Sequence, residues 1–393
     1  MQRPTAEVFR VFLKLGLTSF GGPIAHLGYF HREFVEKRCW LDASHYGQLV
    51  ALCQFLPGPA SSQLGFSLGL LRAGWSGAMA AFIAFTLPSA LLLLAFAQLL
   101  PYLDQPYGQA AIHGLKLVAV AVVAQGVLAM ARRLTPDMPR ALIAAGAAVL
   151  MLVGGPVALP LIVVAAGAVL GLRLCRGVAM APGPTLTVGY GARTGAVLLV
   201  GCGILLLAAL AVGTHAPPLA LVAAGFYRAG ALVFGGGHVV LPLLQQTVVD
   251  PGWVPADEFL AGYGAAQAVP GPMFSLAAYL GARLHGAPGG AIGATVSLIA
   301  IFLPGLLLVA GALPFWHALA GRAGVLRALA GVNAAVVGLL AAALYDPVWT
   351  GAVHAPADVA IALLGFVLLA ATRVSVVIVL VASVLACLLR AGG

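Results

Sequence analysis

The sequence predicts an all-α, polytopic membrane protein with two inverted-topology repeats and broken or re-entrant helices. Three observations support this prediction: an apolar composition, an internal duplication, and a Pro-Gly-Pro triplet inside an apolar segment of each half. Of the 393 residues, 62% are hydrophobic and 8% are charged, and the mean hydropathy is +1.06. This composition excludes a soluble globule, so the lipid bilayer is the expected surrounding.

The basic balance of the chain, a formal net charge of +9, does not indicate a nucleic-acid partner. Lys and Arg occur in short loops between apolar runs, which is typical of cytoplasmic loops. The five cysteines lack C-x-x-C spacing, so we predict no disulfide framework and no metal site. The chain starts with a polar stretch and shows no cleavage site, so no removable signal peptide is expected.

The two halves of the chain repeat one pattern. Phe20-Gly21-Gly22 corresponds to Phe234-Gly235-Gly236 at an offset of 214, and Pro57-Gly58-Pro59 to Pro270-Gly271-Pro272 at an offset of 213. A duplication of this kind decides how the whole fold is interpreted. We expect a first transmembrane repeat in residues 1–175, a linker with one extra transmembrane helix in 176–217, and a second, inverted repeat in 218–393.

Each repeat contains six apolar segments, and we expect each to form a membrane element. In the first repeat they are residues 8–30, 44–71, 74–100, 108–131, 140–153 and 156–173. In the second they are residues 218–248, 257–282, 288–315, 328–345, 357–371 and 374–390. Six segments would leave the two halves parallel, and the additional apolar run at 194–212 inverts the second half.

Loop charges predict the orientation, because short cytoplasmic loops collect Lys and Arg. Basic loops on one side carry Arg132, Arg133, Arg140, Arg173, Arg176, Arg193, Arg322, Arg327 and Arg373. Loops 101–107, 154–156, 213–217 and 345–357 lack Lys and Arg and fall on the other side. The alternation predicts a cytoplasmic N-terminus and a periplasmic C-terminus.

The first two segments of each repeat are expected to be hairpins that turn at their glycine and proline breaks. If segments 8–30, 44–71, 218–248 and 257–282 crossed fully, the basic loop 31–38 would lie outside and the acidic loop 250–258 inside. Both placements oppose the charge rule, whereas hairpins satisfy it. Full crossings are the alternative.

The breaks provide the candidate substrate site. Pro-Gly-Pro cannot continue a regular helix, and hydrocarbon tolerates an opened backbone only where protein or a watery cavity surrounds it. Paired breaks in matching halves indicate a transporter's binding site, and the helix N-termini beside them suit an oxyanion. The alternative is that the glycines only permit close helix packing. The candidate substrate-binding residues at the breaks are Gly21, Gly22, Gln54, Pro57, Gly58, Pro59, Ser61, Ser62, Gly235, Gly236, Gln267, Pro270, Gly271, Pro272 and Ser275.

Two cations, Lys14 and Arg228, occupy equivalent places six residues before the Phe-Gly-Gly breaks. A cation inside an apolar segment is costly and indicates function, and two of them would suit a divalent anion. For Lys14, snorkelling to the membrane interface is the alternative. His26, His31 and His238 follow the glycine breaks and are candidates for coupling proton movement to anion movement, although ordinary hydrogen bonding would also explain them.

The sequence lacks the motifs of an enzyme. It has no H-E-x-x-H, no G-x-S-x-G and no P-loop, so neither hydrolytic nor ATP-driven chemistry is indicated. We therefore predict no enzymatic activity and no cofactor. An anion channel is the competing class, and the duplicated plan with broken helices favours a transporter.

The chain resembles the chromate ion transporter (CHR) family over nearly its whole length. The first half carries Phe20-Gly-Gly-Pro23 with His26, Glu33-Phe34-Val35, Trp40-Leu41, Ala51-Leu-Cys-Gln54, and Leu56-Pro-Gly-Pro59 with Ser62-Gln63. The second half carries Phe234-Gly-Gly-Gly-His238, Pro270-Gly-Pro272 and Gly331-Val-Asn-Ala-Ala-Val-Val-Gly338. One departure is that Asp42 is the single acidic residue between Trp40 and Gln54, where the family pattern leads us to expect more.

The resemblance implies an inner-membrane transporter that exports chromate, confers chromate resistance and is driven by the membrane potential or by a proton gradient, as an antiporter. Sulfate has the same charge, tetrahedral shape and number of acceptor oxygens as chromate. A sulfate or general tetrahedral-oxyanion transporter is therefore the first alternative, and an anion channel is the second. A homodimer is compatible with the sequence.

Overall fold

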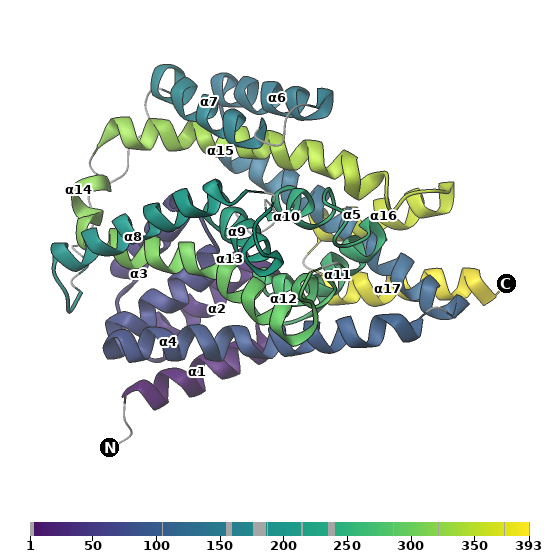
Figure 1. The fold of residues 1–393 in the computed structure, drawn as a ribbon, viewed down its shortest axis with the longest axis horizontal. Coiled ribbons are helices and arrows are strands. Elements are labelled where there is room, and N and C mark those ends of the chain that lie inside the picture. Colours follow the sequence, from purple (N-terminus) through teal and green to yellow (C-terminus); the bar gives the residue numbers. More distant parts are fainter. Residues whose placement is uncertain are drawn as a thin grey trace.

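The computed structural model describes residues 4–103, 105–154, 159–175, 186, 188–213, 215–234, 240–285, 287–320, 322–372 and 374–392. Within these ranges the regular structure is helical throughout, and no strand occurs. The predicted all-α class is therefore confirmed. Figure 1 shows the helices of the two halves intertwined.

The described helices follow the predicted apolar segments. In the first half they are α1 (Pro4–Thr18), α2 (Gly22–His31), α3 (Ala43–Phe55), α4 (Ala60–Leu99), α5 (Pro106–Leu134), α6 (Met138–Val153) and α7 (Leu159–Leu174), with a π-helical turn at Arg32–Lys37. Next comes α8 (Ala192–Ala211), at the position of the predicted extra segment. In the second half they are α9 (Pro218–Ala231), α10 (Val240–Val248), α11 (Ala256–Ala268), α12 (Leu276–Ala282), α13 (Gly290–Ala312), α14 (Trp316–Ala320), α15 (Ala323–Ala343), α16 (Pro356–Ala371) and α17 (Val376–Gly392).

In the described part of the chain, five helical stretches are long and apolar enough to cross a membrane. They are Ala60–Leu103, Pro106–Leu134, Ala192–Ala211, Gly290–Leu319 and Ala323–Trp349. The protein is thus a multi-pass membrane protein. The first stretch is folded, because Ala73 and Gly74 leave the helical conformation and the chain reverses there. A Cβ added at Gly69 would lie 2.3 Å from the carbonyl oxygen of Gly77, so the two arms of α4 pack directly against each other.

The first two segments form hairpins, as predicted. The chain turns between α1 and α2 and runs back, so that Phe12 stacks on Phe34 with ring centroids 5.0 Å apart. Glu7 Oε1 accepts a hydrogen bond from Arg38 Nη1 at 3.3 Å, and Glu7 Oε2 accepts one from Arg72 Nη2 at 3.0 Å. Full crossings would separate these residues by the width of the membrane.

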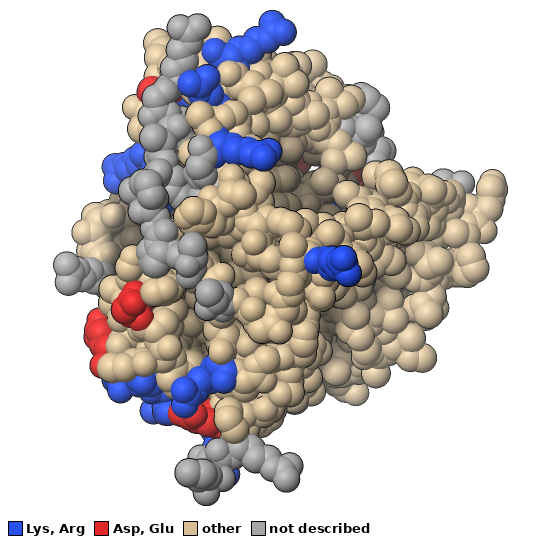
Figure 2. All heavy atoms as spheres, turned by 90° about the vertical axis from the view of Figure 1, so that its left-hand side faces the viewer, with Lys and Arg blue, Asp and Glu red and all other residues tan. Residues whose placement is uncertain are grey.

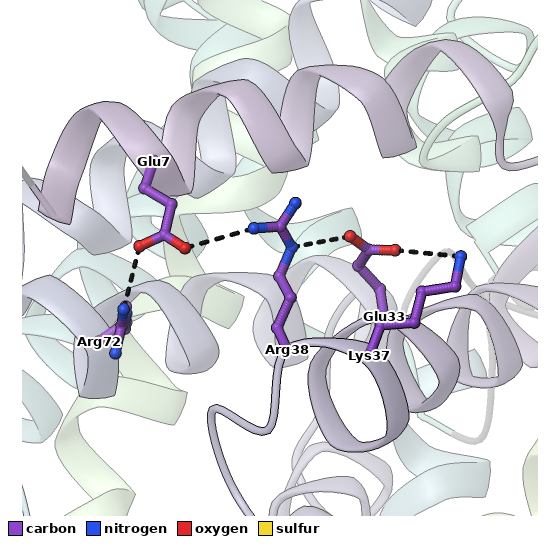
Figure 3. A network of polar contacts seen from close by, with 5 residues as sticks. All are labelled: Glu7, Glu33, Lys37, Arg38 and Arg72. Atoms are coloured by element: carbon purple, nitrogen blue, oxygen red, sulfur yellow. Dashed lines mark hydrogen bonds and ion pairs between the residues drawn. The ribbon is translucent and has the colours of Figure 1, made fainter. Parts of the chain in front are cut away.

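Figure 3 shows the charged network at the base of these two hairpins. Besides the two contacts of Glu7, Glu33 accepts from Arg38 Nε at 2.8 Å and pairs with Lys37 at 3.7 Å. The Arg72 guanidinium also lies 5.2 Å from the centroid of the Trp40 ring. The network therefore connects four parts of the chain: the start of α1, the end of the π-helical turn, the residues just before α3, and the end of the first arm of α4. These four parts lie at the same end of the two hairpins.

The second half contains the corresponding hairpins. Glu258 in the first turn of α11 pairs with Arg283 just after α12, with Nε to Oε2 at 2.8 Å. A Cβ added at Gly225 of α9 would lie 2.6 Å from Thr247 Cγ2 of α10, so α10 returns along α9. The prediction of hairpins is thus confirmed in both halves.

The two sets of hairpins enter from opposite ends of the molecule. The second arm of α4, residues 75–99, begins beside Arg72 and is roughly 37 Å long at 1.5 Å per residue. Its far end, Leu100 and Pro101, lines a cavity of about 380 Å³ together with Pro255, Glu258 and Arg283. The bases of the second set therefore lie a membrane thickness away from the network of Figure 3. The division into residues 1–175, 176–217 and 218–393 stays a prediction.

The outer helices of each half pack against a helix of the other half, and we call them exchanged. In Figure 1, α6 and α7 lie along α15, and α16 and α17 lie beside α5. Small residues allow this close approach: a Cβ added at Gly331 of α15 would lie 2.0 Å from the carbonyl oxygen of Gly167 of α7. On the other side, Asp358 of α16 accepts from His113 Nε2 of α5 at 3.0 Å and from Arg390 Nη1 of α17 at 2.7 Å.

One end of the molecule carries several charged groups on its surface. Figure 2 views the left-hand side of Figure 1, which bears α14 and the start of α1, and shows several groups of Lys and Arg on it.

Candidate functional site

The hairpin tips of the two halves meet inside the molecule. Gly58 donates its backbone N–H to the carbonyl of Val233 at 2.6 Å, and Gly271 donates to the carbonyl of Ser19 at 2.9 Å. Ser19 and Val233 are equivalent at the offset of 214, and Gly58 and Gly271 at 213. Each second-hairpin tip is thus bonded to the first-hairpin tip of the other half, and the same bond occurs twice.

The Pro-Gly-Pro triplets make these contacts because their central glycines adopt conformations that other residues avoid. Gly58 has a φ of 119° and Gly271 a φ of 106°. A Cβ added at Gly58 would lie 3.0 Å from Gly305 Cα of α13, and one added at Gly271 would lie 2.9 Å from Ser89 Oγ of α4. The triplets therefore pack closely against the two long helices that contain a proline, the first against α13 with Pro304 and the second against α4 with Pro88.

Gln63 holds the first triplet in place. Its Nε2 donates to the carbonyl oxygens of Pro57 at 2.9 Å and Gly305 at 3.0 Å, and its side chain is fully buried. The first bond satisfies the Pro57 carbonyl, which lies in the break between α3 and α4, and the second joins the tip to α13. The tip is consequently preorganised by the protein itself.

Buried polar atoms collect around the tips. Ser61, Ser62 and Ser275 are buried, and Ser275 Oγ lies 2.6 Å from Ser89 Oγ. Several buried atoms near the tips have no hydrogen-bond partner among the described residues: Ser19 Oγ, His26 Nδ1, Ser62 Oγ, Gln63 Oε1 and Thr86 Oγ1. Unpartnered buried polar atoms are rare in proteins, and hydroxyl groups can donate to an oxyanion.

Helix N-termini add to this environment. α2 begins at Gly22 and α4 at Ala60, directly after the breaks, and the short helical turn before α12 begins at Met273. The first turn of a helix exposes N–H groups and carries a partial positive charge. The arrangement can therefore stabilise an anion with neutral donors, without a metal or a cofactor being required by its chemistry.

The predicted histidines are placed apart. His26 is fully buried, and its Nε2 lies 3.2 Å from the carbonyl oxygen of Ser19, to which the protonated ring nitrogen donates. His31 is at the base of the hairpin, partly exposed, with Nδ1 3.1 Å from Glu36 Oε1. His238 lies outside the described residues, as do Gly235 and Gly236.

The two predicted cations differ in their exposure. Lys14 is exposed on α1, and Arg228 of α9 is partly buried. Burial raises the pKa of the Glu33 carboxyl at the hairpin base, but the Arg38 hydrogen bond and the charges of Arg38, Lys37 and Lys14 together hold it below its usual value. The charge of Lys14 thus acts on the base network, and its role in anion binding stays a prediction, as does that of Arg228.

The two predicted glutamines differ in their surroundings. Gln54 is partly exposed and its Oε1 accepts from Arg133 Nη2 of α5. Gln267 is 8% exposed and its Nε2 lies 3.1 Å from Met273 Sδ. Gly21 is exposed, Gly22 and Pro57 are partly buried, and Pro59, Pro270 and Pro272 are buried. The structure thus places the second triplet beside Ser19 and Ser89 and the first triplet beside Val233 and Gln63. It leaves Lys14, His31 and Gln54 outside these contacts.

Sequence reasoning missed Gln63, Thr86, Ser89 and Arg133 as neighbours of the site. Gln63 could have been found, because it follows the first triplet by one helical turn. Thr86 and Ser89 flank Pro88, which has a counterpart in Pro304. Arg133 offered no local signal beyond its membership of a basic loop.

Comparison with known proteins shows similarity along both halves. A family model described as chromate transporter matches residues 6–172 and 219–388. A probable chromate transport protein of Synechococcus elongatus is 28% identical over 360 residues, which cover 86% of this chain and 83% of that protein. The chromate transport proteins of Pseudomonas aeruginosa and Cupriavidus metallidurans are 29% and 28% identical, over 86% of this chain and 80% and 81% of their own lengths. No solved structure matches the chain.

Proposed function

The chain belongs to the chromate transporter family, and we propose that it is a secondary active transporter that exports chromate across the cell inner membrane and confers chromate resistance. The observation that carries the proposal is the paired bonding of the hairpin tips, Gly58 to Val233 and Gly271 to Ser19. Broken elements that meet inside two matching halves are typical of alternating-access transporters.

In this proposal the anion binds where the tips meet. Hydroxyl groups of Ser19, Ser62 and Thr86, which have no partner among the described residues, donate to its oxygens. Lys14 and Arg228 balance its charge, and His26 is the described histidine that lies beside the tips and could carry a proton. The two halves rock about the tip contacts, which opens the site to one face and then to the other.

The experiment that tests this function is flux of radiolabelled chromate into proteoliposomes with and without an imposed proton gradient or membrane potential. Accumulation above the external concentration under one of the gradients is expected. Flux that only follows the chromate gradient would support an anion channel instead. Complete inhibition by excess sulfate would redefine the protein as a general tetrahedral-oxyanion transporter, and no flux under any gradient would contradict the proposal.

Arg228→Ala is expected to lower the ratio of maximal flux to half-saturating chromate by at least about tenfold, since a hydrogen bond to a charged group contributes roughly 1.5–3 kcal/mol. The matched control is Arg10→Ala, which removes an exposed cation from the first segment of the other half. Initial rates at a series of chromate concentrations provide the comparison. Equal losses in the two variants would remove Arg228 from the site.

We propose a cytoplasmic N-terminus and a periplasmic C-terminus, and Cys39 offers a direct test. Cys39 lies in the basic loop and is exposed, whereas Cys53, Cys175, Cys202 and Cys387 are buried. A membrane-impermeant maleimide is expected to label Cys39 in inside-out vesicles and to leave it unlabelled in right-side-out vesicles. In a Cys39→Ser background, Thr350→Cys should show the opposite pattern. Labelling of Cys39 from the outside would reverse the orientation.

A homodimer is also part of the proposal, and the mass of the protein–detergent particle tests it.

A further inference from the structure

A cavity with three polar side chains in its lining lies between α3, α5, α6 and α15, outside the cluster of hairpin tips. It has a volume of about 240 Å³ and is lined by Ala51, Gln54, Phe55, Leu134, Arg140, Leu326, Leu329, Ala330 and Asn333. At about 30 Å³ per water molecule, this volume holds several waters or one four-oxygen anion with part of its hydration shell.

Gln54 of α3, Arg140 of α6 and Asn333 of α15 line this cavity, and Arg133 of α5 contacts the lining residue Gln54. Arg133 Nη2 at the end of α5 donates to Gln54 Oε1 at the end of α3, at 2.5 Å. This bond occupies the Gln54 carbonyl and leaves its NH₂ group as a donor. Asn333 of α15 has a buried Oδ1 without a hydrogen-bond partner among the described residues. Rotation of its amide by 180° exchanges oxygen for NH₂ without changing its shape, so this side chain can also donate into the cavity.

Two guanidinium groups differ in their charge balance: Arg140 lines the cavity, and Arg133 contacts its lining residue Gln54. Arg140 uses Nε and Nη2 to bind Asp137 Oδ2, at 2.8 and 2.5 Å, so its own charge is balanced locally. Arg133 is exposed, bonds to the neutral Gln54 amide and pairs with no carboxylate among the described residues. It therefore brings an unbalanced positive charge and a planar set of N–H donors, which suit the oxygens of a tetrahedral anion.

One lining residue of the cavity, Gln54, lies close in sequence to the first triplet. Asn333 is ten residues into α15, which begins at Ala323, so it lies roughly 15 Å along that helix. Gln54 is in the last turn of α3, three residues before Pro57. Because Arg133 ends α5 at the opposite end from the cavity of Lys116 and Arg283, the opening faces the end that bears the network of Figure 3.

The second half does not repeat this cavity chemistry. Gln267, the counterpart of Gln54, is 8% exposed and bonded to Met273 Sδ. At the offset of 214, the counterpart of Arg133 is Pro347 and that of Asn333 is Ala119. The polar set is therefore confined to one face of the protein.

We infer that Gln54, Arg133 and Asn333 form a one-sided loading site, which binds a partly hydrated tetrahedral oxyanion before it reaches the hairpin tips. This inference rests on the proposed transport of chromate. The side chains replace part of the anion's hydration shell, and the Arg133 guanidinium raises the local concentration of divalent anions. The site sets the affinity for substrate at the face with the network of Figure 3, and it has no role in affinity at the opposite face.

The test compares Arg133→Gln and Asn333→Leu with the matched control Arg132→Gln, which removes the neighbouring exposed cation of α5. Exchange of labelled chromate is measured in inside-out and in right-side-out vesicles. For both site variants, half-saturating chromate at the face bearing Arg133 should rise about ten- to a hundredfold, since each lost hydrogen bond to a charged group contributes roughly 1.5–3 kcal/mol. Maximal flux and half-saturation at the other face should stay at the wild-type values, and Arg132→Gln should behave as wild type at both faces.

Unchanged half-saturation in both site variants, or equal increases at the two faces, would overturn the loading site while leaving chromate transport intact. If the wild type carries no chromate, the proposed function fails, and equilibrium binding of labelled chromate to the purified protein decides the inference. Weaker binding in Arg133→Gln and Asn333→Leu than in Arg132→Gln then supports the site. Identical binding in all three overturns it.

Discussion

Replacing Gly58 by alanine is expected to reduce chromate flux at least tenfold while the protein stays in the membrane. Gly58 has a φ of 119°, and a side chain in such a conformation costs about 1–3 kcal/mol. The added Cβ would also lie 3.0 Å from Gly305 Cα, which is backbone and cannot rotate away. The tip must move, so the bond from Gly58 N–H to the carbonyl of Val233 is strained or lost. A displacement of about 1 Å at a reacting or binding centre can cost on the order of a hundredfold.

The control for this prediction is Gly47→Ala in α3, the helix that leads to the same tip. A Cβ at Gly47 meets no atom within 4 Å, and alanine is a better helix former than glycine. Gly271→Ala is the equivalent change in the other half and should resemble Gly58→Ala. Initial chromate flux in proteoliposomes, normalised to the amount of reconstituted protein, separates the variants. Wild-type flux in Gly58→Ala would show that the tips do not bind the anion.

Replacing Asp358 by alanine is expected to produce the largest loss of stability, about 2–3 kcal/mol. Asp358 is 2% exposed, and its carboxylate accepts from His113 Nε2, Arg390 Nη1 and the backbone N–H groups of His354 and Ala355. Its removal leaves the two backbone donors at the start of α16 without their acceptor and breaks the contact between α5 and the exchanged pair α16–α17. The side chains of His113 and Arg390 are 28% and 46% exposed and regain water, which keeps the loss at the lower end for a buried ion pair.

Thermal unfolding in detergent measures this loss as a decrease of several degrees in the apparent midpoint. The matched control is Asp257→Ala, because Asp257 also pairs across the halves, with Lys116 at 2.5 Å, but its carboxylate side chain is 75% exposed. An exposed pair contributes less than about 1 kcal/mol, so little change is expected there. Similar decreases in the two variants would mean that the exchanged helices are not held by Asp358.

Much of the fold could be predicted because its signals are local. Apolar runs marked the helices, including the extra run that became α8. The hairpins followed from two local features together, the glycine and proline breaks and the charges of loops 31–38 and 250–258. The contact of Glu7 with both Arg38 and Arg72 confirms that interpretation.

The candidate site could be predicted only in part. The triplets, Ser61, Ser62 and Ser275 were recognisable because a broken helix with hydroxyl groups is unusual in an apolar segment, and the structure buries the three serines. The neighbours that hold them, Gln63 and Ser89, look in sequence like ordinary polar residues of a helix. His31 was grouped with the breaks by its closeness in sequence, but the length of α2 carries it to the hairpin base, beside Glu36.

The sequence by itself determined the helices, their breaks and the hairpins, because proline geometry, glycine freedom and the free energy of placing charges in lipid act within a few residues. Only the tertiary structure decided which tips meet and that α6 and α7 pack on α15 rather than on α5. It also decided that Gln54 accepts a hydrogen bond from Arg133, whereas Gln267 is buried. These choices depend on the fit of glycine- and alanine-rich helix faces that resemble one another in sequence. With 50 glycines in the chain, many pairings satisfy the local rules, and the packing of the whole molecule selects one.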